Sequence, residues 1–243
     1  MNIIPSIFHN QSEIKSGMST RLGAETQSPF GMNMSFTGGD TFENVQKSRE
    51  YFLAQFGLTP SQLAIPQQSH TDVIKIVTQP GEYESCDGLI TAIPNVFLSI
   101  KVADCAAVIV YDVEKHVCGA FHAGWRGAAA GIVKKGIAMM VEEFNCESRN
   151  ILSFVSPCAG VCCYEIGCDV APFFKEKVLS VRNRKLYLNM KEEIKSQLVS
   201  EGLPEKNIEI HPDCTICRSD VYHSYRRDGE KSGRMMAFIG KIK

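Results

Sequence analysis

Apolar residues gather along the chain in short runs rich in β-branched side chains, and turn residues separate these runs. Runs of this kind are typical of strands. We expect strands over residues 18–21, 63–65, 73–77, 96–102, 106–111, 117–122, 151–155, 185–188, 208–211 and 234–239. The runs on either side of residues 104–105 are the most continuously apolar, which indicates strands of the core.

Three stretches instead place apolar residues every three or four positions, the spacing of a helix with one buried face. Helices are expected over residues 40–57, 128–144 and 192–202. Asp40 is the expected N-cap of the first helix, and Glu43 completes a capping box with it. Arg49 falls on or beside the apolar stripe of that helix, where a guanidinium is costly unless it meets an anion or extends past the edge of the core. The pattern alone favours the second explanation for Arg49.

The order of these elements bounds the fold class. Strands outnumber helices, and neither an internal repeat nor a linker interrupts the pattern. A chain of 243 residues can bury a substantial core and lies at the upper end of common domain lengths. We therefore expect one domain over residues 1–243, of α/β or mixed α+β class, with a large mixed sheet flanked by helices.

Composition excludes several functional classes. The chain is 44% hydrophobic and 22% charged, and its formal net charge of -1 argues against disorder and against a nucleic-acid-binding surface. Residues 1–9 lack the basic segment and the long apolar segment of an export signal, and no apolar run approaches the length of a membrane span. We expect a cytoplasmic protein without nucleic-acid or membrane partners, acting on small neutral or anionic molecules.

The ten cysteines need an explanation, because such a count also occurs in disulfide scaffolds. The large apolar complement and the missing export signal favour reduced thiols instead. Two clusters stand out: Cys158, Cys162, Cys163 and Cys168 form the first, and Cys214 and Cys217 form the second. Only the second has the Cys-x-x-Cys spacing of a structural zinc site, so inert thiols are the favoured interpretation and structural zinc is the alternative.

Candidate chemistry centres on His70, Cys105 and His122, which lie at the ends of expected strands. Two imidazoles and one thiolate leave a tetrahedral zinc ion (Zn) with one open position, which is the arrangement of catalytic rather than structural sites. A water bound there has a pKa near neutrality and supplies hydroxide. Asp104 is a candidate for orienting a histidine or moving protons. It enters the site only if the backbone is irregular, since neighbouring strand residues face opposite sides.

Glycines before the second expected helix provide a further candidate. Gly124 and Gly127 expose amide donors at the positive end of that helix, and Arg126 lies between them, a combination that suits phosphate or another anion. Glycines at such a place often only make the turn. The expected loop 219–233 carries Arg226-Arg227-Asp228-Gly229 and is a candidate rim of the site.

Two other sites can be built from the same residues. A metal-free cysteine hydrolase would use Cys105 as nucleophile, His122 as base and Asp104 or Gln68 as the orienting group. A copper site would use His70, Cys105 and His122 as trigonal ligands, with Met139 or another methionine as a weak axial ligand.

Five motifs in order along the chain carry a resemblance to a known family. They are Gln68-Ser69-His70, Ala103-Asp104-Cys105, His122-Ala123-Gly124-Trp125-Arg126-Gly127, Cys162-Cys163-Tyr164-Glu165-Ile166-Gly167, and Cys214-Thr215 with Ser224-Tyr225-Arg226-Arg227-Asp228-Gly229. The chain with these motifs resembles the YfiH-like family. That family is also called the laccase-domain or multicopper polyphenol oxidoreductase family, and its members are described as purine nucleoside phosphorylases.

The resemblance implies a YfiH-like fold and a zinc held by the positions of His70, Cys105 and His122. It implies phosphorolysis of adenosine, inosine and methylthioadenosine and deamination of adenosine, with a purine nucleoside and phosphate as partners. It places Arg49 near the substrate, with Arg126 assisting. Copper-dependent oxidation of polyphenols and hydrolysis of peptidoglycan precursors are the alternatives that the family's other labels imply. The usual trinuclear copper cluster needs many histidines. The chain has six, and only two of them lie in the motifs, so it cannot build such a cluster.

Overall fold

The computed structural model describes residues 2–23 and 29–243, and its described part contains two six-stranded sheets and one three-stranded sheet. The first sheet has the order β1 (Asn2–Ile3), β2 (Ile14–Ser19), β15 (Met235–Lys241), β7 (Phe97–Val102), β3 (Leu63–Pro66) and β5 (Gly81–Tyr83). The second has the order β14 (Ile208–Ile210), β10 (Ile151–Val155), β8 (Ala106–Asp112), β9 (Val117–Ala123), β6 (Gly88–Thr91) and β4 (Ile74–Ile76). The small sheet has the order β11 (Glu165–Ile166), β13 (Lys185–Leu188) and β12 (Leu179–Arg182). The helices are α1 (Phe42–Ala54), α2 (Trp125–Ala129), α3 (Ile132–Phe144), α4 (Met190–Ser200) and α5 (Tyr225–Asp228).

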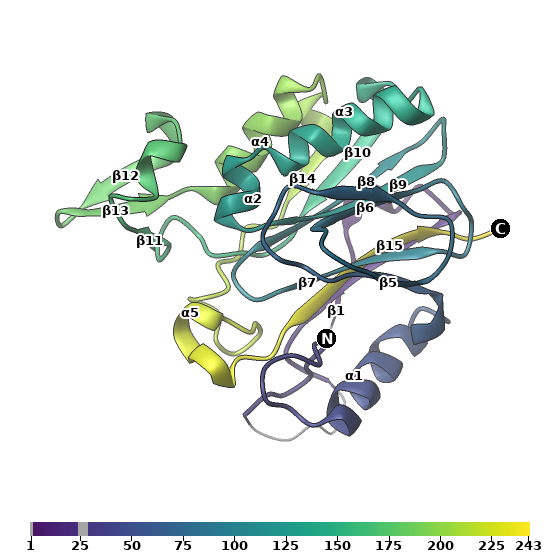
Figure 1. Ribbon diagram of the computed structural model, residues 1–243, viewed down its shortest axis with the longest axis horizontal. Helices are drawn as coiled ribbons and strands as arrows, with labels where there is room; N and C mark the ends of the chain where they lie inside the picture. Colours follow the sequence, from purple (N-terminus) through teal and green to yellow (C-terminus); the bar gives the residue numbers. More distant parts are fainter. Residues whose placement is uncertain (1, 24–28) are drawn as a thin grey trace.

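The two large sheets pack face to face, with helices on their outer sides (Figure 1). Alternate residues of the central strands fill the space between the sheets. These include Leu98, Ile100, Val102, Ala107, Ile109, Ala120, Ala237 and Ile239. The other residues of the same strands face the helices, so strands of both sheets are buried on both sides. This double burial explains why the apolar runs in the sequence are continuous rather than alternating.

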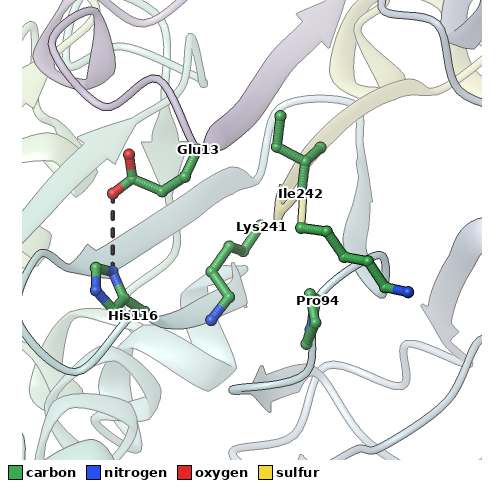
Figure 2. Close-up of a pocket in the computed structure, with 6 residues that line it drawn as sticks. Glu13, Pro94, His116, Lys241 and Ile242 are labelled. Carbon is green, nitrogen blue, oxygen red and sulfur yellow. Dashed lines mark ion pairs between the residues drawn. The ribbon is translucent and has the colours of Figure 1, made fainter.

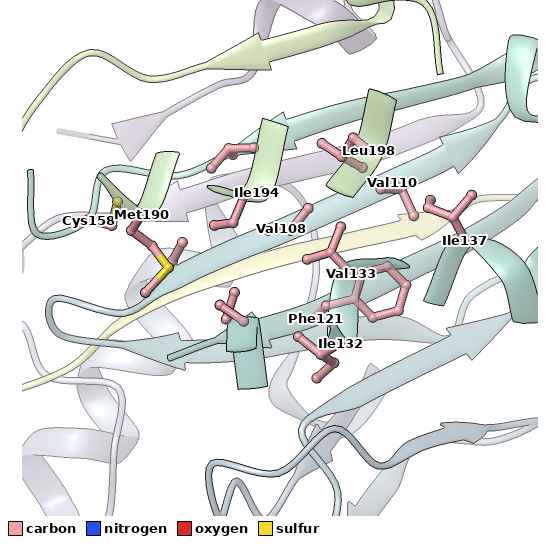
Figure 3. Close-up of a cluster of buried hydrophobic side chains, with 14 of the residues drawn as sticks. Val108, Val110, Phe121, Ile132, Val133, Ile137, Cys158, Met190, Ile194 and Leu198 are labelled. Atoms are coloured by element: carbon pink, nitrogen blue, oxygen red, sulfur yellow. The ribbon is translucent and has the colours of Figure 1, made fainter. Parts of the chain in front are cut away.

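Helices α3 and α4 cover the outer face of the second sheet (Figure 3). The side chains in contact there come from β8, β9 and the two helices, and they include Val108, Val110, Phe121, Ile132, Val133, Ile137, Ile194 and Leu198. Helix α1 covers the outer face of the first sheet, where Phe52 meets Phe238 edge to face with ring centroids 5.7 Å apart. Each large side chain buried in this way stabilises the fold by about 1.5–3 kcal/mol.

The mixed class and the flanking helices confirm the expectation from the sequence, while the arrangement differs in detail. The strands form two packed sheets, because an apolar run does not indicate whether a helix or another sheet covers each face. Thr41 rather than Asp40 caps α1, since its hydroxyl accepts from the Asn44 amide at 3.2 Å. The helix expected over 128–144 is divided at Gly131, whose φ of +78° separates α2 from α3. That residues 1–243 form a single domain stays a prediction.

The strand pairing brings distant residues to one end of the two sheets. β8 pairs with β9 in antiparallel register, Ala106 opposite Ala123, so the residues just before β8 meet the end of β9. β15 pairs with β7, Met235 opposite Val102, which brings the C-terminal strand to the same end. Residues 67–73 pass from β3 of one sheet to β4 of the other. None of the helices in the described ranges has the length and apolar character needed to cross a bilayer.

Candidate metal centre

His70, Cys105 and His122 converge at this end of the sheets. Cys105 directly precedes β8, His122 lies near the end of β9, and His70 lies in the segment between β3 and β4. One ligand atom from each residue lies within 4.8 Å of the others, and the Cys105 Sγ is 4.0 Å from the His70 Nε2. Around a tetrahedral zinc, a nitrogen and a sulfur ligand are about 3.5 Å apart, given metal bonds of about 2.0 and 2.3 Å. The three side chains therefore fit one cation with only small adjustments.

Asp87 orients two of these side chains. It is fully buried, and its Oδ1 lies 2.6 Å from the His122 Nδ1, so the His122 Nε2 is left free to act as a ligand. The same carboxylate accepts hydrogen bonds from the backbone amides of Ser69, His70 and Thr71. These bonds hold the segment around His70, whose φ of +63° is unusual for a residue other than glycine. Asp87 thus positions both histidines at once.

Asp87 is not identified from the sequence, because Asp87-Gly88 is also a common turn sequence. Gly88 in fact begins β6, and Asp87 lies one residue before it, beside the end of β9. The signal in the sequence was an aspartate directly before an apolar run. Asp87 is fully buried, and a buried carboxylate requires several hydrogen-bond donors.

Asp104 lies next to Cys105 in the turn between β7 and β8, with a φ of +82°. The irregular backbone allows both neighbours to reach this end of the sheets. The Asp104 carboxylate accepts from the Thr215 hydroxyl at 2.7 Å, the Ser224 hydroxyl at 3.0 Å and the Arg226 amide at 2.7 Å. It therefore holds the start of α5 against the loop that carries Cys105.

Gly124 leaves space for His70 and Cys105 to approach a common ion. A Cβ at this position would lie 2.9 Å from the His70 Cδ2 and 3.1 Å from the Cys105 Sγ, so only glycine lets both ligands approach this closely. Its φ of -73° shows that the requirement is space rather than backbone conformation. The donor set and the room around it both fit zinc or copper.

The charges of the trio also favour a cation. Burial opposes ionisation of the Cys105 thiol, yet the facing His122 and His70 lower its pKa to about 6. Burial likewise disfavours the charged imidazole of His122, but Cys105 and Asp87 raise its pKa to about 9. The site therefore contains a thiolate and, behind His122, the Asp87 carboxylate, and a metal ion would balance their negative charge.

A cavity of about 960 Å³ opens in front of the trio. His70, Cys105 and His122 form part of its wall together with four basic residues and three aromatic residues. The basic residues are Arg49, Lys101, Arg226 and Arg234, and the aromatic residues are Phe36, Tyr164 and Tyr225. This volume lies within the range of pockets that hold small molecules and cofactors.

Arg49 is buried and reaches this cavity from α1. It does not extend past the edge of the core into solvent, as the apolar pattern of that helix favoured. Its exposed fraction is 6%, its Nε donates to the Met34 carbonyl at 2.8 Å, and its guanidinium lies 4.3 Å from the centre of the Phe36 ring. Burial lowers the pKa of Arg49 to about 10, while Glu82 opposes that shift. The residue remains a cation at neutral pH and points into the cavity rather than past the core.

Neither Arg126 nor Gln68 takes the place that sequence reasoning gave it. Arg126 is exposed, lies over the Trp125 ring at 4.3 Å and is not among the residues lining the cavity. Gln68 lines the cavity, but its amide is bonded to the backbone of Lys101 at both ends, at 2.8 and 2.9 Å. Gln68 thus fixes the loop before His70 to β7 and does not orient a histidine ring. Of residues 226–229, the expected rim, Arg226 lines the cavity.

A second, smaller cavity of about 420 Å³ lies near the other end of β8 and β15 (Figure 2). Its wall includes Glu13, Pro94, His116 and Lys241, and the ion pair between His116 and Glu13 spans 3.7 Å. It contains neither group of potential metal ligands found in the described residues. The larger cavity is therefore the candidate active site.

Comparisons with known proteins show the family and the fold. The profile of the family described as "Multi-copper polyphenol oxidoreductase laccase" matches residues 15–241. A protein of Aquifex aeolicus named "Purine nucleoside phosphorylase" is 37% identical over 176 residues, which are 72% of this chain and 81% of that protein. "Adenosine deaminase RL5" from an unknown prokaryotic organism is 26% identical over 86% of each chain. The crystal structure of YlmD from Geobacillus stearothermophilus matches with a TM-score of 0.91 at 27% identity, covering 98% of this chain and 94% of that one.

The family profile spans nearly all of the chain, and the fold match extends over the same residues. The resemblance that the motifs indicated is therefore confirmed. This chain belongs to the multi-copper polyphenol oxidoreductase laccase family, the YfiH-like family.

Proposed function

We propose that this protein is a zinc-dependent purine nucleoside enzyme, which cleaves adenosine, inosine and methylthioadenosine with phosphate and also deaminates adenosine. The observation that carries the proposal is the meeting of two imidazoles and one thiolate in the wall of a cavity lined by cations and aromatic rings. Relatives named as purine nucleoside phosphorylase and adenosine deaminase support the same substrate class.

The cations of the cavity are suited to phosphate. None of the ion pairs found in the described part of the chain involves Arg49, Lys101 or Arg234, so their charges are not neutralised by a direct carboxylate partner. Unpaired cations in a sheltered cavity bind an anion more strongly than they would in open solvent. In phosphorolysis, these groups would hold the phosphate oxygen that bonds to the ribose anomeric carbon as the bond to the base breaks.

The aromatic residues are suited to the purine. Phe36, Tyr164 and Tyr225 line the same cavity, and purine rings stack readily on aromatic side chains. Each of these rings lies beside a cation: Arg49 lies over Phe36, Arg234 lies 5.3 Å from the centre of Tyr225, and Arg226 lies 5.4 Å from the centre of Tyr164. The cavity would thus place the base between aromatic surfaces and the phosphate among basic side chains.

His70, Cys105 and His122 would hold the zinc. When bound, zinc would supply Lewis acidity at an open coordination position, which is the chemistry that deamination by water requires. Asp87 would keep His122 in the tautomer that presents Nε2, and Gly124 would leave the ligands room. Asp104 would act by positioning, because its carboxylate is already bonded to Thr215, Ser224 and the Arg226 amide.

Two alternatives remain tied to the same trio. The laccase name of the family suggests copper, yet the two groups of potential metal ligands in the described residues contain only two histidines between them. A trinuclear copper cluster needs many more. A cysteine hydrolase would use the Cys105 thiolate directly and would need no metal.

The decisive experiment incubates protein purified without added metal with adenosine, in the presence and absence of phosphate, and separates the products by chromatography. We expect phosphate-dependent release of adenine with ribose 1-phosphate, and phosphate-independent formation of inosine. Removal of metal with a chelator should abolish both, and zinc should restore both. Full activity after complete metal removal would favour the cysteine hydrolase and contradict the proposal, as would restoration by copper alone.

Lys101 gives the phosphate step a pH dependence. Burial and the neighbouring Arg49 lower the pKa of Lys101 to about 8, while Glu82 opposes that shift. A lysine is charged below its pKa, so its attraction for phosphate is present below about pH 8 and lost above it. We expect the KM for phosphate to rise by up to about tenfold from pH 7 to pH 9, because only about one-tenth of such a group is protonated at pH 9.

The matched variant for this prediction is Lys101→Arg, whose guanidinium stays charged over the whole range. Its KM for phosphate should change little between pH 7 and pH 9. The KM for the nucleoside, measured at saturating phosphate, serves as the internal control. An equal rise in the KM for phosphate in both proteins would rule out Lys101 as the group responsible.

A further inference from the structure

Four cysteines from two distant parts of the chain meet outside the candidate active site. Cys162 and Cys163 lie between β10 and β11, and Cys214 and Cys217 lie between β14 and α5. One sulfur from each lies within 4.8 Å of the others, and the Cys217 Sγ is 3.5 Å from the Cys162 Sγ and 3.3 Å from the Cys163 Sγ. From the sequence, the absence of a second Cys-x-x-Cys pair favoured inert thiols. The fold supplies the missing pair with two adjacent cysteines.

The sulfurs have the spacing of ligands around one small cation. A tetrahedral zinc with four Zn–S bonds of about 2.3 Å places its sulfurs about 3.8 Å apart. Two of the separations are 3.3 and 3.5 Å, slightly below that value, and the others are at most 4.8 Å, so small adjustments would place all four sulfurs around one ion. A disulfide would need about 2.05 Å between two sulfurs and would leave the other two thiols without a role. We propose that Cys162, Cys163, Cys214 and Cys217 bind a second zinc ion, which is structural rather than catalytic.

The surroundings of Cys214 are those of a thiolate ligand. The backbone amide of Gly160 donates to the Cys214 Sγ at 3.2 Å, and the amides of Ile216 and Cys217 also donate to it. Amide donors at a sulfur stabilise its negative charge and orient it, as they do around metal-bound thiolates. A Cβ at Gly160 would lie 3.0 Å from the Cys214 Cβ and 3.1 Å from the Cys162 Sγ, so a glycine here lets the two halves of the group approach.

Four ligands would fill the coordination sphere, so this ion would have no open position for chemistry. Its place in the fold shows what it would stabilise. Thr215, between the two cysteines of the Cys-x-x-Cys pair, donates its hydroxyl to Asp104 at 2.7 Å, and its carbonyl accepts from the Arg227 Nη1 at 2.9 Å. Asp104 adjoins Cys105 of the first centre. The second zinc would therefore join the β10–β11 loop to the segment before α5 and keep this wall of the cavity in place.

The test begins with Cys105→Ala protein, which lacks a ligand of the first centre, so that bound zinc reports the four-cysteine group alone. We expect about one zinc per chain in this variant and about two in the unchanged protein, measured by elemental analysis. X-ray absorption at the zinc edge of the variant should show four sulfur ligands at about 2.3 Å and no nitrogen. This measurement needs no further substitution, so it remains informative if removal of another cysteine prevents folding.

A second substitution assigns the ligands. Adding Cys217→Ser to Cys105→Ala should remove the remaining zinc, whereas adding Cys168→Ser, an exposed cysteine outside both groups, should leave it. A Cys105→Ala protein without zinc, or one whose zinc has nitrogen ligands or survives Cys217→Ser, would overturn the proposal. So would a disulfide among these four cysteines in protein purified without reductant, shown by thiol titration and mass spectrometry. None of these outcomes depends on which reaction the first centre catalyses.

Discussion

Cys105→Ala is expected to abolish both phosphorolysis and deamination, by more than about 100-fold. Changes in the second layer around a metal typically cost about 10–100-fold in affinity or activity, and this substitution removes a ligand itself. The two remaining ligands, His70 and His122, would bind zinc weakly and without the thiolate that offsets the charge of the ion. Zinc content should fall by about one ion per chain as product formation is lost. Both are measured on protein of unchanged far-UV circular dichroism.

Cys118→Ala is the matched control, because Cys118 is also a buried cysteine on β9, the strand that carries His122. Burial raises the pKa of the Cys118 thiol to about 12, so it stays protonated and is a poor ligand. This control should retain its zinc and its turnover, with at most a small loss of thermal stability. Full turnover in a correctly folded Cys105→Ala protein would contradict the metal-centred mechanism.

His70, Cys105 and His122 could be predicted as candidate ligands from the sequence, because histidine and cysteine are the residue types that bind transition metals. Two histidines and a cysteine at the ends of apolar runs are suitable metal ligands, and the strands beside them were long enough to be expected. Their convergence depends on the pairing of β8 with β9 and on the passage of residues 67–73 between the sheets. The sequence indicated the candidate ligands, and the topology brings them together.

The layers of the fold and the cations of the cavity could not be predicted in the same way. Strands buried on both faces have the same apolar pattern whether a helix or a second sheet covers them, so one large sheet was expected where two are found. Lys101 and Arg234 lie on or beside strands of the first sheet, and they line the cavity together with residues 35–37 and 225–226, which are distant in the sequence. Arg126 has a suitable charge, but α2 presents it on the outside.

The four-cysteine group shows a different limit of sequence reasoning. In typical zinc sites, the two cysteines of each pair are separated by two to four residues. Cys162 and Cys163 are adjacent and do not have this spacing. Adjacent cysteines can both face one point when the chain turns between β10 and β11, which the hydrogen bonds from the Cys163 and Tyr164 amides to the Gly160 carbonyl show. Turn geometry of this kind has no distinct signature in the pattern of apolar and polar residues.

Asp87→Asn should weaken zinc binding by about 10–100-fold and lower the free energy of unfolding by roughly 3–5 kcal/mol, the cost of breaking a buried charged pair. The carboxylate accepts from three backbone amides, the Thr71 hydroxyl and the His122 Nδ1, and its hydrogen bonds to His122 and these amides keep the pKa of Asp87 well below its usual range despite burial. An amide of the same shape has one acceptor oxygen, so its NH₂ group must face some of these donors. His122 would then lose the partner that fixes its tautomer, and His70 would lose support for its strained backbone.

Asp112→Asn is the matched control for Asp87→Asn. It also removes a buried carboxylate, but one that does not contact a candidate metal ligand. Asp112 is also fully buried and accepts from the amides of Glu114 and Lys115, but it lies at the opposite end of β8 from Cys105. This variant should lose stability while retaining its zinc affinity, measured by competition with a chromogenic chelator. If Asp87→Asn and Asp112→Asn bind zinc equally well, then Asp87 supports only the fold. If only Asp87→Asn loses affinity, and excess zinc restores its turnover, then the carboxylate positions the ligands of the metal.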